Sequence, residues 1–459
     1  MNRKTKRRLG ISTTAVALVA LAAYLWSYCV HAKSTPTIDY GSQIQAAARD
    51  PKLVANEALY PAFIEVVSEF SRSIQSHNKI LDGAAKDMDL DAVLSCESSI
   101  DNQLLVDSAL AYLNADGVFE RTRVIPHLYG GLRSYSKATP LIDSGLKEIG
   151  ATRAHTRLQR IRLDKAIRSD DIETATPALE ELLSAVRHIA YQGLYVDASL
   201  DCTVRGTVSS QIAGLASCGQ VSPAMAAALL PVLSEYQQTY AIARSFRIEQ
   251  FIALDAVQHL YTDDGTGDGR MIVQEMLKLG SPNDDRGAWV NLAGMFVASR
   301  REVEADIKAT FITAATIADK SFRDRIPMSP LRQRSSLGKL SFSLTPIMFP
   351  DVKELAARAD SATQQYHSAM IACALIVHHA NHGEYPAKLS ELAPLLPAAA
   401  LSDPLAPDTQ FIYIRSENAY SLWSTGTDGD NDHGIMAPRD QNANKGRQIV
   451  DGDILLLPR

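Results

Sequence analysis

Cysteine is scarce in this chain. Its 459 residues include five cysteines, and no two of them have the spacing of a zinc finger. An exported protein can form disulfides, and Cys202 and Cys218 are the pair closest in sequence. They are the first choice for a disulfide, and the equal alternative is that both are small buried thiols.

Motifs of nucleophilic and phosphate chemistry are absent as well. The sequence contains no Gly-x-Ser-x-Gly elbow and no phosphate-binding Gly-Lys-Ser/Thr loop. We therefore expect no catalysis. The alternative is an envelope enzyme whose site is spread over the helical part and carries no motif.

A zinc-binding helix is not indicated either. His378 and His382 are one helical turn apart, as in some metal sites. The His-Glu-x-x-His pattern is missing, however, and these histidines end a predicted helix, where they interact favourably with the helix dipole. The sequence favours this second interpretation.

The overall charge also lacks a strong sign. The formal net charge is -6, so a nucleic-acid partner is not expected. A second basic group, Arg323, Arg325, Arg332 and Arg334, fits a solvated linker face better than an anionic partner. Residues 2–8 form a basic run, and residues 11–30 are apolar and uncharged. This pattern predicts a single-pass inner-membrane helix with a cytoplasmic N-terminus and a periplasmic, extracytoplasmic bulk. The alternative is a signal peptide cleaved after Ala32.

Four regions follow from the composition. Residues 1–32 form the basic tail and membrane anchor, and residues 33–322 carry apolar residues three and four apart, typical of an irregular bundle or stack of helices. Thr176-Pro177 and Ser222-Pro223 each predict an N-cap followed by proline at the first helical position. Residues 323–350, rich in proline, predict a linker.

Residues 351–459 predict a small α+β domain. A long helix starts at Asp351 and ends near Gly383, which supplies a left-handed C-cap. Residues 410–415 and 420–424 alternate as a β-hairpin, and residues 454–457 read as a last strand. One helix on a small antiparallel sheet is an α+β unit.

The order of motifs here resembles the globular domain of the major (G-type) pseudopilins of type II secretion systems. The resemblance lies in Gly383-Glu384-Tyr385-Pro386, Leu389 with Leu392, Asp403-Pro404, the hairpin, and the acidic loop that starts at Thr427. It covers roughly a quarter of the chain. The remainder resembles membrane-anchored envelope proteins without an assigned role.

The N-terminus departs from the pseudopilin pattern. Pseudopilins begin with a short leader and a hydrophobic helix whose early Glu guides assembly, and residues 11–30 contain no Glu. We therefore expect neither pilin processing nor polymerisation. A role as a type II secretion component remains the alternative to that of a structural or interaction protein with a partner in the cell envelope.

The resemblance implies calcium in the C-terminal acidic loop. Calcium takes six to eight oxygen ligands, which an acidic loop can supply. The candidate ligands are Asp428, Asp430, Asp432, Asp451 and Asp453. The alternative is an acidic, solvated turn.

A second candidate calcium loop lies in the helical part. Asp264, Thr266 and Asp268 occupy positions one, three and five of an EF-hand spacing, Gly269 position six and Glu275 position twelve. Apolar stripes flank the loop on both sides. The alternative is a Gly-rich turn between two helices.

Overall fold

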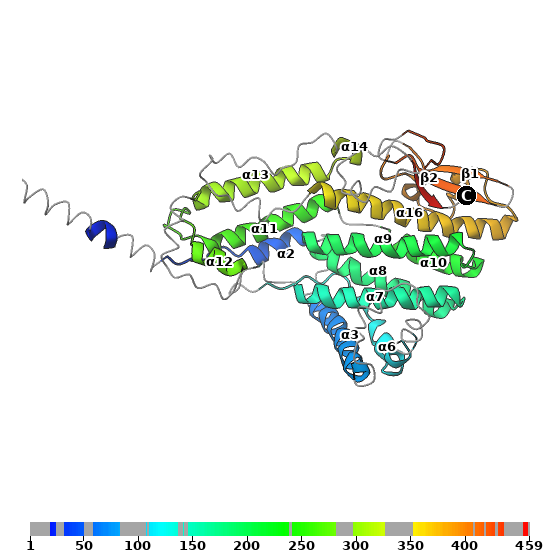
Figure 1. Ribbon diagram of the computed structural model, residues 1–459, viewed down its shortest axis with the longest axis horizontal. Helices are drawn as coiled ribbons and strands as arrows, with labels where there is room; N and C mark the ends of the chain where they lie inside the picture. Colours follow the sequence, from blue (N-terminus) through cyan, green and yellow to red (C-terminus); the bar gives the residue numbers. More distant parts are fainter. Residues whose placement is uncertain are drawn as a thin grey trace, which may run out of the picture.

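The computed structural model describes most of the chain and confirms a mainly helical fold with a small antiparallel sheet near the C-terminus (Figure 1). The described residues are 19–23, 32–49, 58–82, 107, 110–135, 141, 146–237, 241–280, 297–325, 352–406, 409–416, 419–426, 430–435 and 453–457.

Most helices run along the long axis of an elongated stack, while α3 projects from it (Figure 1). The helices before residue 240 are α2 (Tyr40–Ala48), α3 (Leu59–Asp82), α6 (Val118–Thr122), α7 (Leu146–Arg168), α8 (Ile172–Gln192), α9 (Tyr195–Ser217) and α10 (Pro223–Glu235), with a short 3-10 helix, η1 (Ile125–Leu128). The later ones are α11 (Ile242–Leu260), α12 (Val273–Gly280), α13 (Arg300–Ala318), α14 (Phe322–Arg325) and α16 (Val352–His382), followed by η5 (Leu389–Leu392) and η6 (Ala398–Leu401).

One of the two predicted helix starts is confirmed. Ser222 caps α10, because its hydroxyl accepts a hydrogen bond from the Met225 amide at 3.0 Å. The prediction at Thr176 is wrong: α8 begins at Ile172, capped by Asp171. The physical reason is burial. A start at Ile172 places Ala175 in the core, and this outweighs the one backbone hydrogen bond that is lost because Pro177 has no N–H.

Helix α16 lies at the centre of the largest hydrophobic cluster. Every side chain from Ala369 to Leu375 is fully buried. They share this cluster with α8, α9 and α10 and with the strand residues Leu422 and Leu457. Residues on both sides of the predicted linker thus contribute to one core, whereas residues 326–350 lie outside the described residues.

The sheet has the strand order β1–β2–β3, where β1 is Ile412–Arg415, β2 Tyr420–Ser424 and β3 Ile454–Leu457. Both pairings are antiparallel, so the predicted hairpin and last strand are confirmed. The sheet lies near the C-terminal half of α16 (Figure 1). The φ angle of Gly383 is 77°, the left-handed conformation predicted for the end of this helix.

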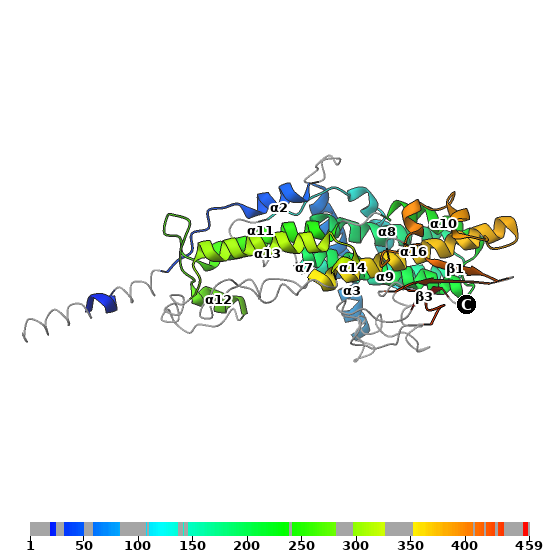
Figure 2. The ribbon, with the colours of Figure 1, turned by 90° about the horizontal axis from the view of Figure 1, so that it is seen from above.

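A second hydrophobic cluster occupies the other end of the stack. It joins α2, α11 and α13, which run side by side (Figure 2), and it includes Val352 and Leu355 from the first turn of α16. Helix α16 therefore contributes to both clusters.

Of the two alternatives for Cys202 and Cys218, the structure shows free thiols. Cys202 is a buried free thiol within α9, and Cys218 is an exposed free thiol at the C-terminal end of the same helix. Sixteen residues of α-helix separate their backbones by about 24 Å, far beyond the reach of a disulfide.

Within the described residues, no helix is long and apolar enough to cross a membrane. Residues 19–23 are helical, while the rest of the predicted anchor, residues 11–18 and 24–30, lies outside the described residues.

A buried carboxylate joins α8 to α6 and α7. Glu181 is 1% exposed and accepts hydrogen bonds from the Thr122 hydroxyl and the Gln159 amide, both at 2.5 Å. Its nearest cation, Arg162, is 3.8 Å away. Burial therefore raises the pKa of Glu181 from 4.5 to about 7, although the Thr122 hydrogen bond and Arg162 act in the opposite direction.

This raised pKa predicts a stability that falls as the pH rises. The folded state binds the proton more tightly, so the stabilisation is complete below pH 4.5 and is lost as the pH rises through about 7. The loss amounts to about 3 kcal/mol. Urea unfolding should show that the free energy of unfolding changes less between pH 5 and pH 8 in Glu181→Gln than in the unmutated protein. Exposed Glu235→Gln serves as the control, and parallel pH profiles for Glu181→Gln would contradict the assignment.

Candidate functional site

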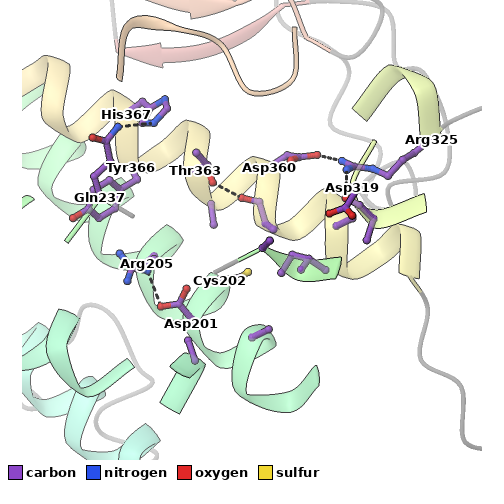
Figure 3. A pocket seen from close by; sticks show the side chains of 18 of the residues that line it. Asp201, Cys202, Arg205, Gln237, Asp319, Arg325, Asp360, Thr363, Tyr366 and His367 are labelled. Carbon is purple, nitrogen blue, oxygen red and sulfur yellow. Dashed lines mark hydrogen bonds and ion pairs between the residues drawn. The ribbon is translucent and has the colours of Figure 1, made fainter. Parts of the chain in front are cut away.

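A polar cavity of about 320 Å³ lies between α9, the start of α11, the end of α13 and the first half of α16 (Figure 3). Six of its polar side chains form three pairs: Asp201 with Arg205, Arg325 with Asp360, and Gln237 with His367. Alanine side chains make up most of the remaining wall, which leaves room between these groups.

The first group is a buried ion pair on α9. Arg205 Nε lies 2.6 Å from Asp201 Oδ1, and Arg205 Nη1 donates to the Tyr236 carbonyl. Burial acts to lower the pKa of Arg205, but the Asp201 carboxylate and other acidic neighbours outweigh it and raise this pKa. Arg205 is therefore a fixed positive charge in the wall of the cavity, matched by Asp201.

The second group closes one end of the cavity. Arg325, on α14, pairs with Asp360 on α16 and donates to the Lys320 carbonyl at 2.6 Å. The side chain of Arg325 thus ties the C-terminal end of α13 to α16.

The third group supplies neutral hydrogen-bonding atoms. His367 Nδ1 lies 3.2 Å from the Ser402 carbonyl, which can only accept, so this nitrogen carries the proton. His367 Nε2 then faces Gln237 Nε2 at 3.4 Å as an acceptor. Burial lowers the pKa of His367, and the ring is neutral near pH 7.

The side chains of the cavity are better suited to binding a ligand than to nucleophilic attack on one. Burial raises the pKa of the Cys202 thiol to about 12, so it is protonated and weakly nucleophilic at neutral pH. The Tyr366 hydroxyl donates to the Leu233 carbonyl at 2.8 Å. This cavity could not be foreseen from the sequence, because its residues come from five separate segments of the chain. The only sequence signal is the Asp201–Arg205 pair, four residues apart on an apolar helix.

The predicted EF-hand-like loop is a tight turn between α11 and α12. A bridge between Tyr261 and Met271 closes it. Asp264 Oδ1 accepts from the Thr266 amide at 2.8 Å and from the Thr266 hydroxyl at 2.7 Å. These hydrogen bonds lower the pKa of Asp264. Glu275 lies in the first turn of α12.

The same loop caps the N-terminus of α13. Asp268 Oδ1 accepts from the Arg301 amide at 3.1 Å, and the Arg300 amide donates to the Gly269 carbonyl at 3.0 Å. Burial acts to raise the pKa of Asp268. The hydrogen bonds that its carboxylate accepts from backbone amides outweigh this effect and lower the pKa. Asp268 therefore has a structural role even without a cation, and calcium binding by Asp264, Thr266, Asp268 and Glu275 stays a prediction.

The C-terminal acidic residues are described only in part. Asp428 and Asp451 lie outside the described residues, Asp430 is exposed and Asp432 is half-buried. Asp453 is 1% exposed and directly precedes β3. Its Oδ2 accepts from the Gly434 amide at 2.6 Å, whereas its buried Oδ1 has no hydrogen-bond partner among the described residues.

Backbone contacts hold the acidic loop against Asp453. The Asp453 amide donates to the Ile435 carbonyl at 2.8 Å, and the Ile435 amide donates to the Asp432 carbonyl at 3.1 Å. Trp423 Nε1 donates to Asn431 Oδ1 at 3.2 Å, which ties the loop to β2. Within the described parts of the chain, no three His, Cys, Asp or Glu side chains form a group able to hold a metal ion.

Comparisons with known proteins give no assignment: no protein-family model matches the chain, and neither do any curated protein or solved structure. The geometry therefore carries the functional argument.

The loop between α11 and α12 gives a test that separates structure from metal binding. With EGTA present, Asp268→Ala should lower the free energy of unfolding by about 1 kcal/mol, comparable to a lost helix cap. Glu275→Gln should leave it within about 0.5 kcal/mol of the unmutated value under the same conditions. If the loop binds calcium, Glu275→Gln should then reduce the stabilisation that added calcium produces. Urea unfolding measures both effects, and an unchanged stability of Asp268→Ala would refute the capping role.

Proposed function

We propose that this protein is a membrane-anchored, extracytoplasmic interaction protein whose C-terminal part is stabilised by calcium. The observation that carries the proposal is the buried Asp453 carboxylate, one oxygen of which has no hydrogen-bond partner among the described residues. A buried carboxylate with an unpartnered oxygen is costly, and a bound cation is a common way to offset that cost.

The chain around Asp453 supports a calcium ion. Asp430 and Asp432 lie on the segment that is hydrogen-bonded to the Asp453 backbone, and although the three carboxylates do not form a ready ligand group in this structure, a shift of that segment would bring them to one ion. Calcium prefers such oxygen ligands and accepts irregular geometry, and backbone carbonyls or water complete its shell. In this proposal Asp453 is the fixed ligand and the acidic loop closes over the ion.

The order of elements supports the same proposal. The long helix α16 is followed by the Gly383 turn, the 3-10 helix η5, the Asp403-Pro404 turn, a hairpin and a last strand. This is the order implied by the pseudopilin resemblance. The loop that resemblance assigns to calcium is the one that lies beside Asp453.

In this proposal a membrane anchor at residues 11–30 holds this unit outside the inner membrane. The basic residues 2–8 and the apolar residues 11–30 support a cytoplasmic N-terminus, and calcium is far more available outside the cytoplasm. A partner in the cell envelope would then meet the helical stack or the calcium-stabilised sheet.

Calcium should stabilise the full-length protein. At a hundredfold excess over Kd, ligand binding to the folded state alone adds about 2.7 kcal/mol to the free energy of unfolding. Urea unfolding with calcium and with EGTA measures this increment. Asp453→Asn should abolish it, whereas Glu173→Gln, at an exposed position in α8, should retain it. Identical unfolding curves with calcium and with EGTA would disprove the proposal. The full chain is required because α16 shares its core with α9 and α10.

A second candidate function is favoured by the cavity beside α16. Its wall presents both charge signs, through Arg205, Arg325 and Lys320 and through Asp201, Asp319 and Asp360, and this balance suits a small zwitterionic molecule such as an amino acid or a short peptide.

A cavity-filling variant tests this candidate. Ala359→Phe should abolish any increase in melting temperature that a panel of amino acids and dipeptides produces, because the added ring occupies the space between α9 and α16. Ala309→Phe, at an exposed position of α13 outside the cavity, is the matched control. The absence of any ligand-induced shift in the unmutated protein would remove this candidate.

A further inference from the structure

Two buried histidines line the interface by which α3 joins the stack. His155 lies on α7 and His188 on α8, and both side chains are fully buried. The His155 ring meets the Phe70 ring edge-on, with centroids 4.9 Å apart, and the His188 ring stacks on the Phe63 ring at 4.7 Å. Phe63 and Phe70 lie two helical turns apart on one face of α3. The two histidines therefore cover the same apolar face.

This face holds α3 in place. Tyr60, Phe63, Val67 and Phe70 are buried and recur at the three- and four-residue spacing of an amphipathic helix. Helix α3 packs against α6, α7, α8 and η1 mainly through these side chains, and it otherwise projects from the stack (Figure 1). Its docking therefore depends on a narrow interface that includes both imidazole rings.

Three of the four imidazole nitrogens in this interface have no hydrogen-bond partner among the described residues. They are both nitrogens of His155 and Nδ1 of His188. His188 Nε2 lies 3.1 Å from the Ile125 carbonyl, which only accepts, so this nitrogen carries the proton of the neutral ring. A proton added to either ring would therefore find no acceptor in the interface.

Burial makes both rings resist protonation. The pKa of His155 falls from 6.5 to about 3, with burial as its cause. The pKa of His188 falls to about 4, because burial and the neighbouring Arg187 outweigh the hydrogen bond to the Ile125 carbonyl. A cation–π contact with Phe63 would offset only part of the cost of a buried, unpaired charge on His188.

The other charged groups around α3 are paired with each other or exposed. Glu69 of α3 lies 3.0 Å from Arg121. Glu148 of α7 lies 3.0 Å from Arg133 and accepts a hydrogen bond from the Tyr60 hydroxyl at 3.3 Å. Four more charged residues in these segments are exposed: Glu65, Arg72, Glu120 and Arg123.

We propose that α3 is released by acid, because protonation of His155 and His188 weakens its docking and frees its apolar face. The docked helix excludes water from both rings. Once α3 has left, water solvates the rings and each can carry a proton at no cost of burial. This device is independent of the proposed calcium site.

The pH range follows from the two pKa values. Docking is strongest above pH 6.5, the pKa of an exposed imidazole, and weakens as the pH falls toward about 4. At pH 5 each ring lowers the docking constant about 30-fold, and the two together on the order of 1000-fold. Glu181 acts in the opposite sense, since its proton stabilises the folded chain, so its titration cannot cause a release in acid.

Hydrogen exchange of the full-length protein tests the release. Because a helix without its packing frays, amides of residues 58–73 should exchange on the order of 1000-fold faster at pH 5 than at pH 7.5, once intrinsic rates are corrected for. Amides from Ala369 to Leu375 in α16 serve as the internal reference and should stay protected at both pH values. Unchanged protection of α3, or an equal loss in α16, would overturn the proposal.

Replacing the rings assigns the effect. His155→Phe removes no hydrogen bond and should reduce the acceleration to about 30-fold, and adding His188→Phe should abolish it. His155→Leu replaces His155→Phe if the larger ring prevents folding, which circular dichroism checks. His127→Phe, at an exposed position of η1, is the matched control and should keep the full acceleration. The same acceleration in the double variant as in the unmutated protein would refute the role of the histidines.

Discussion

The burial of α16 is the constraint on which the rest of the structure depends. Ala369 to Leu375 has no exposed side chain, so this helix must be covered on all sides. Helices α9 and α10 cover part of it, and the sheet and the short helices that follow α16 cover another part. The C-terminal α+β elements are therefore packed as part of the helical stack, and their hydrophobic residues do not form a separate core.

Buried or half-buried polar groups join the helices of the stack at several points. Glu181 joins α8 to α6 and α7, the Arg205–Asp201 pair faces the gap between α9 and α16, and Asp268 receives the N-terminus of α13. Each position costs desolvation energy that hydrogen bonds or an opposite charge offset in part. Asp453 and Glu181 each have one buried oxygen without a hydrogen-bond partner among the described residues, but Arg162 lies 3.8 Å from that of Glu181, whereas an acidic segment lies beside Asp453. Asp453 is therefore the strongest indication of a cation.

The sequence predicted the local elements near the C-terminus well. The end of α16, the hairpin and the last strand were readable because Gly383 and two-residue alternation act locally. The start of α8 was misread because burial of Ala175 outweighs the local preference of Thr176-Pro177. Whether Cys202 and Cys218 pair could not be decided from their spacing, and in the structure a helix holds them apart. The cavity was not predictable, since tertiary packing alone brings its residues together. The contacts of His155 and His188 with α3 were likewise not predictable, because they also depend on tertiary packing.

Helix α16 has 31 residues and is about 46 Å long, and its two ends belong to different hydrophobic clusters. Because the helix is continuous, neither cluster can unfold completely without disturbing the part of α16 that packs in the other cluster. Amide protons in the middle of α16 should consequently exchange with solvent only through the largest unfolding events of the molecule. Helix α16 therefore couples the two clusters mechanically. A displacement of the strands at its C-terminal end is transmitted along the helix to α11 and α13 at its N-terminal end.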